Sequence, residues 1–409
     1  MILEIILALL LGILAGTITG LTPGIHINLI SSLILALYTT TFLENFSLPL
    51  VIFVISLSIT HTFVDFIPSI FLGAPDETSF LSVLPGHELL LEGKGYEALV
   101  YTLYGGLTAL LIILFTTPIF IFFLPKIYPY ALNIMPWILI VFSLYLISTE
   151  KNTKKILFAI IFFLASGFLG IVVLDLAEIK PNFNEPLLPL FSGLFGASNL
   201  IISINKKTKI PKQEIKPIKK INIQKKSFLE STLISTIVSP LTAFLPGLGA
   251  SQAAVIGTEL SGKTSKQNFL FLVGAINIIV MGLSFIGLYS INKTRTGSAL
   301  AVKKLISVLT FEHLLIILTI ITLSGTLSFF LSLSIGKIIS KKINTINYSK
   351  ISIIVLMILT FFIILLTKYL GLIIFITSTS LGICCILIGV KRSNLMGCLL
   401  LPTILFYLF

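Results

Sequence analysis

The chain has few charged residues. Asp, Glu, Lys and Arg make up 11% of its 409 residues, and 56% of the residues are hydrophobic; soluble domains carry about 25% charged residues. Apolar stretches of about 18 or more residues, each long enough to cross a hydrocarbon core about 30 Å thick, recur along the whole chain. This composition excludes a soluble fold. It predicts that the entire chain is a multi-pass membrane domain of the cell (plasma) membrane.

The sequence also lacks the motifs of common enzymes. It contains no HExxH zinc motif, GxSxG elbow, Walker loop or GxGD protease motif. The pairs His61/Asp65 and His87/Glu88 would supply only two ligands each to a metal ion. We therefore expect no enzyme, no catalytic residues, no cofactor and no metal site, and we disfavour an intramembrane hydrolase.

Acidic residues are the rarer of the charged ones, with 16 Asp and Glu against 28 Lys and Arg. The basic residues cluster between apolar stretches, as in cytoplasmic loops that face anionic lipid, so no nucleic-acid partner is expected. The longest polar stretch carries nine lysines: Lys206, Lys207, Lys209, Lys212, Lys216, Lys219, Lys220, Lys225 and Lys226. We interpret it as a cytoplasmic linker, residues 205–227, between a first membrane unit (1–204) and a second (228–409).

The other basic clusters support this topology. They are Lys151, Lys154 and Lys155, then Lys341 and Lys342, then Lys391 and Arg392. The positive-inside rule places all of them in the cytoplasm as solvated loops. Apolar segments are predicted at 2–19, 25–41, 48–72, 98–124, 131–149, 156–174, 187–204, 228–245, 250–261, 268–290, 306–338, 351–368, 371–390 and 394–409. This pattern predicts about ten to twelve spans.

The two units share a sequence pattern. Residues 20–28, GLTPGIHIN, correspond to residues 243–251, AFLPGLGAS, and each is followed by a long apolar segment with polar residues in it. The topology makes the two units enter the membrane from opposite faces. We therefore predict an all-α polytopic protein of two inverted repeats, each with about five to six helices and a Pro-Gly re-entrant or broken hairpin.

The Pro-Gly segments are candidate substrate sites. Proline removes a backbone donor and glycine tolerates any φ, so a helix breaks there, and freed amides at a half-helix amino terminus suit a carboxylate or phosphate. The candidates are Thr22, Pro23, Gly24 and Asn28 in the first unit, and Pro246, Gly247, Gly249, Ser251 and Gln252 in the second. The alternative is a simple Pro kink with packing glycines.

Basic residues predicted on the outer side extend this hypothesis. Lys293 and Arg295, followed by Lys303 and Lys304, fall outside, against the usual charge bias. One explanation is a miscounted crossing. The other is that Lys293 and Arg295 line a water-filled cavity and bind the anion.

Ionisable residues inside or next to apolar segments are candidates for ion coupling. His61 and Asp65 lie four residues apart and share one helix face. They could relay a proton, or they could form a structural hydrogen bond. The full candidate set is His26, His61, Asp65, Asp76 and Glu77. Asn277 takes the comparable place in the second unit and cannot titrate.

Glycines at four-residue spacing predict close helix packing. Gly12, Gly16 and Gly20 lie on one face of the first segment, so a neighbouring backbone can approach it. Gly105-Gly106 and Gly167, Gly170, Gly193 and Gly196 are interpreted in the same way.

Several pieces of the chain match a known family. They are residues 16–24 (GTITGLTPG), 67–75 (IPSIFLGAP), 84–86 (LPG), 92–98 (EGKGYEA) and 244–249 (FLPGLG). With these pieces the chain resembles the large membrane subunit (permease) of the tripartite tricarboxylate transporters, as a divergent prokaryotic, archaeal member. The pattern departs from the family at residues 25–28 and at Asp76-Glu77, whose charges would repel a polyanion unless protons or cations neutralise them.

The resemblance implies a secondary transporter. It would move a small organic anion, a carboxylate, with H⁺ or Na⁺ by alternating access in the lipid bilayer, and would work with a small membrane subunit and an extracytoplasmic binding protein. The alternative function is a polyprenyl-phosphate lipid translocase, which needs a lateral apolar opening instead of a closed polar pocket. A non-transporting membrane scaffold is a third, weaker alternative.

Overall fold

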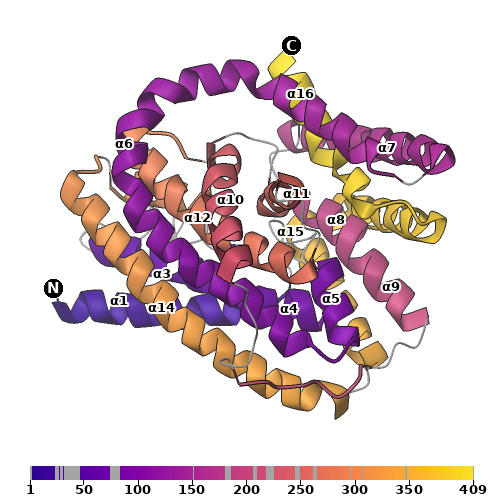
Figure 1. The fold of residues 1–409 in the computed structure, drawn as a ribbon, viewed down its shortest axis with the longest axis horizontal. Helices are drawn as coiled ribbons and strands as arrows, with labels where there is room; N and C mark the ends of the chain where they lie inside the picture. Colours follow the sequence, from indigo (N-terminus) through magenta and orange to yellow (C-terminus); the bar gives the residue numbers. More distant parts are fainter. Residues whose placement is uncertain are drawn as a thin grey trace.

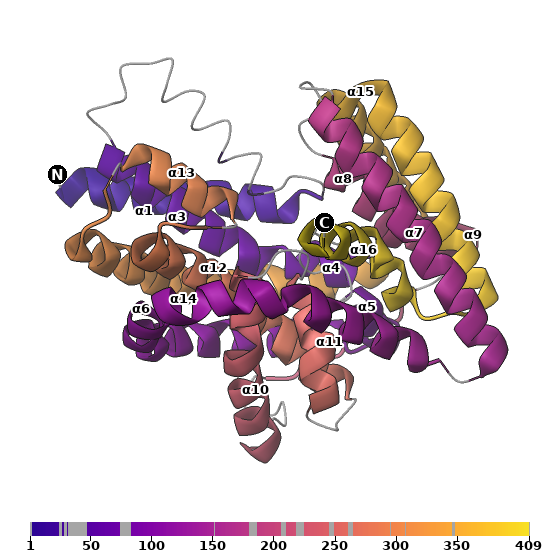
Figure 2. The same ribbon diagram turned by 90° about the horizontal axis from the view of Figure 1, so that it is seen from above.

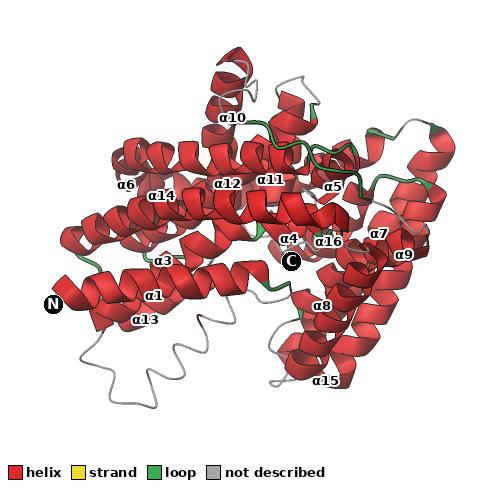
Figure 3. Ribbon diagram, turned by 90° about the horizontal axis from the view of Figure 1, so that it is seen from below, coloured by secondary structure: helices red, strands yellow, loops and turns green. Residues whose placement is uncertain are grey.

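The computed structural model is helical throughout the part of the chain that it describes. That part comprises residues 2–23, 27, 31, 47–73, 83–150, 152–179, 186–205, 210–217, 225–244, 249–260, 265–294, 296–306, 308–345 and 348–408. No strand occurs among these residues (Figure 3). Nine of the described helices are long and apolar enough to cross a membrane, by length and composition. The chain is therefore an all-α polytopic membrane protein, as predicted.

The long helices alternate with short ones along the chain (Figure 1). The long helices are α1 (Ile2–Leu21), α3 (Ser47–Val64), α6 (Gly95–Ser148), α7 (Thr153–Ile179), α10 (Lys225–Phe244), α12 (Lys266–Ile291), α14 (Phe311–Lys342) and α15 (Tyr348–Ile388). The short ones are α4 (Phe66–Phe71), α5 (Val83–Leu91), α8 (Leu187–Phe191), η2 (Ser192–Ala197), α9 (Ser198–Asn205), α11 (Ala250–Leu260), α13 (Gly297–Leu305), η4 (Ile343–Thr345), η5 (Arg392–Met396) and α16 (Gly397–Leu408).

Helix α6 differs from the sequence prediction. Segments 98–124 and 131–149 were expected to be separate, but they form one helix of 54 residues that contains Pro118, Pro125, Pro129 and Pro136. Figure 1 shows α6 bending around the edge of the molecule. At 1.5 Å per residue it is about 80 Å long, more than twice the thickness of the hydrocarbon core. Proline can bend a helix without ending it, which accounts for a continuous but bent α6.

The predicted boundary between segments 351–368 and 371–390 is confirmed. Helix α15 consists of two helices joined at Lys368, whose φ of 55° and ψ of −149° are not helical. One prediction for the basic loops is wrong. Arg392 was expected in a solvated loop, but it is buried, and its guanidinium donates to the carbonyls of Leu194 and Phe195. Those carbonyls belong to η2, a π-helical turn whose i→i+5 bonding alters the usual backbone pairing.

Helices from the two predicted units interleave. A similar series of helices occurs in both halves. In each, a long helix is followed by a buried span, a nine-residue helix and a second long helix: α1, α3–α4, α5 and α6 in the first half, and α10, α12, α13 and α14 in the second, where α11 lies between α10 and α12. Helix α6 packs on α12 and α14 packs on α3, while α5 touches α12 and α13 touches α3. Each half therefore contacts the central span of the other half. This reciprocal pattern agrees with two related units, and their inverted relation stays a prediction.

The two largest apolar cores belong to two groups of helices that lie side by side (Figure 2). The larger is formed by α1, α3 to α5, the first part of α6 and α10 to α14. The smaller is formed by the second part of α6 with α7, α8, η2, α15 and α16. Helix α6 crosses from one core to the other, so its bend sets how the two groups of helices meet.

The glycine prediction is confirmed on α1. A Cβ added at Gly12, Gly16 or Gly20 would collide with α3, with the Leu57 carbonyl oxygen among the obstructing atoms at Gly16. The same kind of contact joins α6 to α12, where Gly105 faces the Phe271 backbone and Gly274 faces that of Thr102. The absence of side chains at these positions lets two pairs of helices pack with their backbones in contact.

Candidate functional site

The two central spans are the most enclosed helices of the fold. In α3–α4 and in α12, 89% of the most apolar window is buried inside the protein, whereas the lipid-facing α1 reaches 22%. Both central spans carry polar residues despite this burial. Polar groups held inside a membrane domain usually mark a pathway for substrate or ions.

On the first central span, polar residues surround a local irregularity at Asp65, whose φ of −61° and ψ of −22° remain in the right-handed helical region. Asp65 separates α3 from α4, and Pro68 follows three residues later. Proline supplies no N–H and its ring crowds the carbonyl four residues before it, so the helix cannot run through undistorted. His61 and Asp65 are 2% and 4% exposed. The Nδ1 atom of His61 lies 3.0 Å from the Thr19 hydroxyl of α1.

The second central span carries a buried amide. Asn277 is 5% exposed, and its Nδ2 atom has no hydrogen-bond partner in the part of the chain that the structure describes. An amide without a partner inside a membrane domain is costly unless a ligand, an ion or water satisfies it. Asn277 is thus a polar group of α12 that is open to such a ligand.

A basic pocket lies at the carboxyl end of α12. Its volume is about 340 Å³, and it is lined by Tyr128, Ala243, Phe244, Ile291, Asn292, Lys293, Thr294, Leu300, Lys303 and Tyr407. Helix α12 ends here because Asn292 adopts a left-handed conformation with φ of 52°, which asparagine tolerates better than most residues. The pocket therefore forms where α6, α10, the α12–α13 turn, α13 and α16 meet.

Two ammonium groups belong to this pocket. Lys303 donates to the Asn292 carbonyl at 2.9 Å, and Lys293 lies over the Tyr128 ring, 5.4 Å from its centroid. Neither lysine is paired with a carboxylate among the described residues. The buried Thr294 hydroxyl also has no hydrogen-bond partner among them. These groups can donate several charge-assisted hydrogen bonds to an anion.

The pocket includes the two residues that precede the second predicted Pro-Gly segment in the described part of the chain. Ala243 and Phe244 line it and are the last residues of α10. Gly249, at the far end of that segment, accepts a hydrogen bond from Ala253 N in the first turn of α11. Of the predicted substrate residues, the structure places Lys293 in this pocket.

The other predicted substrate residues are placed only in part. Thr22 donates to the Ile18 carbonyl at 2.8 Å at the end of α1, and Pro23 follows in a turn. Gly24, His26, Asn28, Asp76, Glu77, Pro246, Gly247 and Arg295 lie outside the described residues, as do the side chains of Ser251 and Gln252. No contact between the two Pro-Gly segments is among the contacts of the described residues.

The sequence did not identify Lys303, Tyr128 or Tyr407 as pocket residues. Lys303 was noted only for its charge, because the helix that presents it, α13, was taken for a loop. Nine residues are too few to cross a membrane, and a sequence this short has too little hydrophobic periodicity to distinguish a helix from a turn. Tyr128 and Tyr407 come from distant parts of the chain, and only the tertiary fold reveals their proximity.

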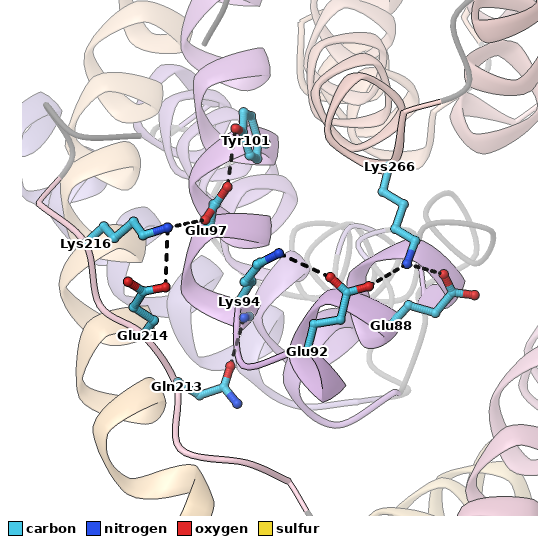
Figure 4. A network of polar contacts seen from close by, with 10 residues as sticks. Glu88, Glu92, Lys94, Glu97, Tyr101, Gln213, Glu214, Lys216 and Lys266 are labelled. Carbon is cyan, nitrogen blue, oxygen red and sulfur yellow. Dashed lines mark hydrogen bonds and ion pairs between the residues drawn. The ribbon is translucent and has the colours of Figure 1, made fainter. Parts of the chain in front are cut away.

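At the opposite end of α12, ion pairs join the acidic stretch to basic residues (Figure 4). Lys266 binds Glu88 and Glu92 at 2.8 Å each, while Lys216 of the linker lies 3.7 Å from Glu97. The hydrogen bonds from Lys266 hold the pKa of Glu92 below its ordinary value. The acidic stretch and the linker therefore share one face of the protein, as the topology predicted, and linker lysines help to balance its charge.

An apolar groove lies near the basic pocket, along the last turns of α10. Its volume is about 610 Å³, and it is lined by Trp137, Ile138, Val141, Phe142 and Tyr145 of α6, Leu241 of α10 and Ile256 of α11. Trp137 and Val141 are largely exposed. The groove therefore presents an apolar surface on the outside of the helix bundle.

Comparison with known proteins gives two matches. A model of the tripartite tricarboxylate transporter TctA family matches residues 6–397. An uncharacterized protein of Methanocaldococcus jannaschii is 32% identical over 364 residues, which covers 87% of this chain and 88% of that protein. No solved structure matches the chain. The family match spans both central helices and both pocket lysines.

Proposed function

The chain belongs to the tripartite tricarboxylate transporter TctA family, and from this premise we propose that it is a secondary transporter for a small organic carboxylate, coupled to H⁺ or Na⁺. The family's proteins are the large membrane subunits of such transporters, and the described helices have the number and length of a multi-pass membrane protein. The observation that supports the proposal is the basic pocket, which Lys293 and Lys303 line together with Phe244, the last described residue before the second Pro-Gly segment.

The pocket has the chemistry of a carboxylate site. Its volume of about 340 Å³ is near the lower end of the range for small-molecule sites, about 300–1,000 Å³. Two lysine ammonium groups and the Thr294 hydroxyl can each donate to a carboxylate oxygen. A ligand with two or more carboxylates would use both lysines at once, whereas a monocarboxylate would leave one of them unpaired.

The partners follow from the same premise. If the linker face is cytoplasmic, the basic pocket at the other end of α12 faces the extracytoplasmic side, where a binding protein would deliver substrate. A small membrane subunit would complete the assembly in the plasma membrane. His61 with Thr19, and Asp65 between α3 and α4, are the proposed coupling groups, because they are buried and ionisable on a central span.

Thermal unfolding of purified protein tests whether the pocket binds carboxylates. We expect di- and tricarboxylates to raise the Tm of the wild type, because a ligand that binds only the folded state stabilises it. Lys293→Gln and Lys303→Gln should each abolish most of that shift. Lys304→Gln is the matched control, since Lys304 is the neighbouring lysine on α13, is exposed and does not line the pocket. An equal shift in all four proteins would contradict the assignment.

The apolar groove favours a second candidate function, a polyprenyl-phosphate lipid translocase. The groove and the basic pocket both touch the last turns of α10, through Leu241 and Phe244 respectively. An amphiphile with an anionic headgroup could bind its headgroup in the basic pocket and its apolar chain in the groove. A short-chain polyprenyl phosphate added to the same Tm measurement separates the functions, since stabilisation by this lipid alone would replace the carboxylate transporter with the translocase.

A further inference from the structure

Lys266 connects the two halves of the protein at the end of α12 opposite the basic pocket. It is the first residue of α12, and its Nζ lies 2.8 Å from Glu88 Oε2 on α5 and 2.8 Å from Glu92 Oε1 just after α5 (Figure 4). Helix α12 belongs to the second half of the chain, and α5 to the first. Helix α12 has 26 residues. At a rise of 1.5 Å per residue, the Lys266 contact lies about 39 Å from the basic pocket.

Stabilisation of its own helix does not explain Lys266. A positive charge in the first turn opposes the helix dipole. The amino terminus of α12 is already capped by Ser265, whose hydroxyl accepts a hydrogen bond from Asn268 N at 3.2 Å. The favourable interactions of Lys266 are therefore with the two carboxylates of the other half.

The inter-half linker holds those carboxylates in place. Gln213 donates to the Leu90 carbonyl at 3.0 Å and accepts from Gly95 N at 2.8 Å, so one side chain satisfies backbone groups on both sides of the α5–α6 break. Glu214 N donates to the Gly93 carbonyl at 2.7 Å. The linker thus fixes the end of α5 to the start of α6. Of the side chains described in this cluster, Lys266 is the one that contacts α5 from α12.

The ion pairs are suited to opening and closing. Lys266 is 36% exposed, and Glu88 and Glu92 are 56% and 43% exposed, so water is available to replace each partner. Lys94 lies 3.5 Å from Glu92 and stays with α5 when Lys266 leaves. Separation of α12 from α5 therefore leaves Glu92 paired and Glu88 in water, with no buried charge uncompensated.

We propose that Lys266, Glu88 and Glu92 form the cytoplasmic gate of the transporter, closed in this structure while the basic pocket at the other end of α12 is open. This inference rests on the proposed transport function. Breaking of the Lys266 contacts lets the amino end of α12 separate from α5 and releases the substrate into the cytoplasm. The gate is the point at which the first half and the second half move relative to each other.

Hydrogen exchange in the full-length protein tests the gate without requiring transport. Lys266→Gln should increase the exchange rate of backbone amides in 83–94 and 266–272 by about two- to fivefold, the factor that an exposed ion pair of up to about 1 kcal/mol represents. The reversed triple variant K266E/E88K/E92K should restore the wild-type rate. Lys216→Gln is the matched control. Lys216 is 37% exposed and its ion pairs are with Glu97 of α6 and Glu214 of the linker, so neither pair reaches α12.

Uptake measurements then test the consequence for transport. In a variant without native cysteines, Lys266→Cys with Glu88→Cys, joined by a short bis-maleimide, should lose carboxylate uptake in proportion to the cross-linked fraction. Full uptake by the cross-linked protein would overturn the gate, as would equal hydrogen exchange in Lys266→Gln and Lys216→Gln. Absence of uptake in the parent variant and in the wild type would refute the proposed function instead, and the hydrogen exchange result would still decide whether Lys266 closes this end.

Discussion

Single polar residues distinguish α3 and α12 from the helices that face lipid. His61, Asp65 and Asn277 are each at most 5% exposed within the two central spans. The bilayer offers no water to such groups, so each needs a partner inside the protein or a ligand. His61 has Thr19 of the neighbouring helix as a partner. Because only His61 and Asp65 of these three can titrate, proton coupling should depend on the first half of the chain.

His61→Asn tests that dependence. Asparagine can still hydrogen-bond Thr19 but cannot carry a proton, so we expect uptake driven by a pH gradient to fall at least tenfold while exchange of substrate across the membrane continues. Thr19→Val removes the partner but keeps the titrating group, and it should shift the pH dependence without abolishing uptake. Unchanged gradient-driven uptake in His61→Asn would exclude His61 as the coupling residue.

His87 makes a separate prediction about stability. Burial on α5 lowers its pKa from the ordinary value of 6.5, and the hydrogen bond with the Ile70 backbone and the charge of Glu88 oppose that effect only in part. The unfolded chain therefore takes up a proton near pH 6.5 that the folded protein resists. The stability that neutral His87 contributes is present above pH 6.5 and is lost as the pH falls below it.

The measurement is the Tm of the detergent-solubilised protein between pH 7.5 and pH 5.5. The wild type should lose more Tm over this interval than His87→Gln, which has no group that titrates there. Equal slopes in the two proteins would show that His87 is not buried in its neutral form.

At the scale of helices, packing through glycine was predictable and helix continuity was not. The spacing of Gly12, Gly16 and Gly20 identified the face of α1 that meets α3, because only small residues let two backbones approach. The sequence predicted two segments, 98–124 and 131–149, but the structure has one bent helix, α6, through its four prolines. Helices α5 and α13 were missed because nine residues carry too little periodic signal. The basic pocket was accordingly predicted only through Lys293.

Gly16→Val should destabilise the α1–α3 contact. The new side chain would meet the Leu57 carbonyl and Thr60, and overpacking of this kind costs about 1–3 kcal/mol. Leu14→Val on the exposed face of the same helix is the control, since Leu14 is 58% exposed and points away from α3. Thermal unfolding in one detergent compares the two variants. A Tm for Gly16→Val equal to that of Leu14→Val would show that the helices do not pack as closely as the structure indicates.

On the scale of the whole molecule, α12 connects two chemically different ends. The end at Lys266 is closed by ion pairs and lies on the same face as the linker, and the end at Lys293 opens into the basic pocket. The reciprocal contacts of α6 with α12 and of α14 with α3 bring both halves to this axis. Sequence similarity between residues 20–28 and 243–251 suggested two related units, but long-range contacts such as these are not encoded in local periodicity. They emerge only when distant helices pack.

This arrangement favours alternating access over a fixed channel. A channel would need both ends open at once, whereas here one end is closed by the interaction of the two halves. The relative movement of α12 and α5 would open the cytoplasmic end. The basic pocket would then supply the substrate selectivity and the buried groups of α3 the coupling.

The most direct test of carboxylate transport is the uptake of radiolabelled di- and tricarboxylates by proteoliposomes that contain the purified chain, under an imposed pH or Na⁺ gradient. We predict saturable uptake that K293Q/K303Q reduces at least tenfold and that Lys304→Gln leaves unchanged. Uptake that is absent in the wild type, or equal in wild type and K293Q/K303Q, would contradict a carboxylate transporter that uses this pocket.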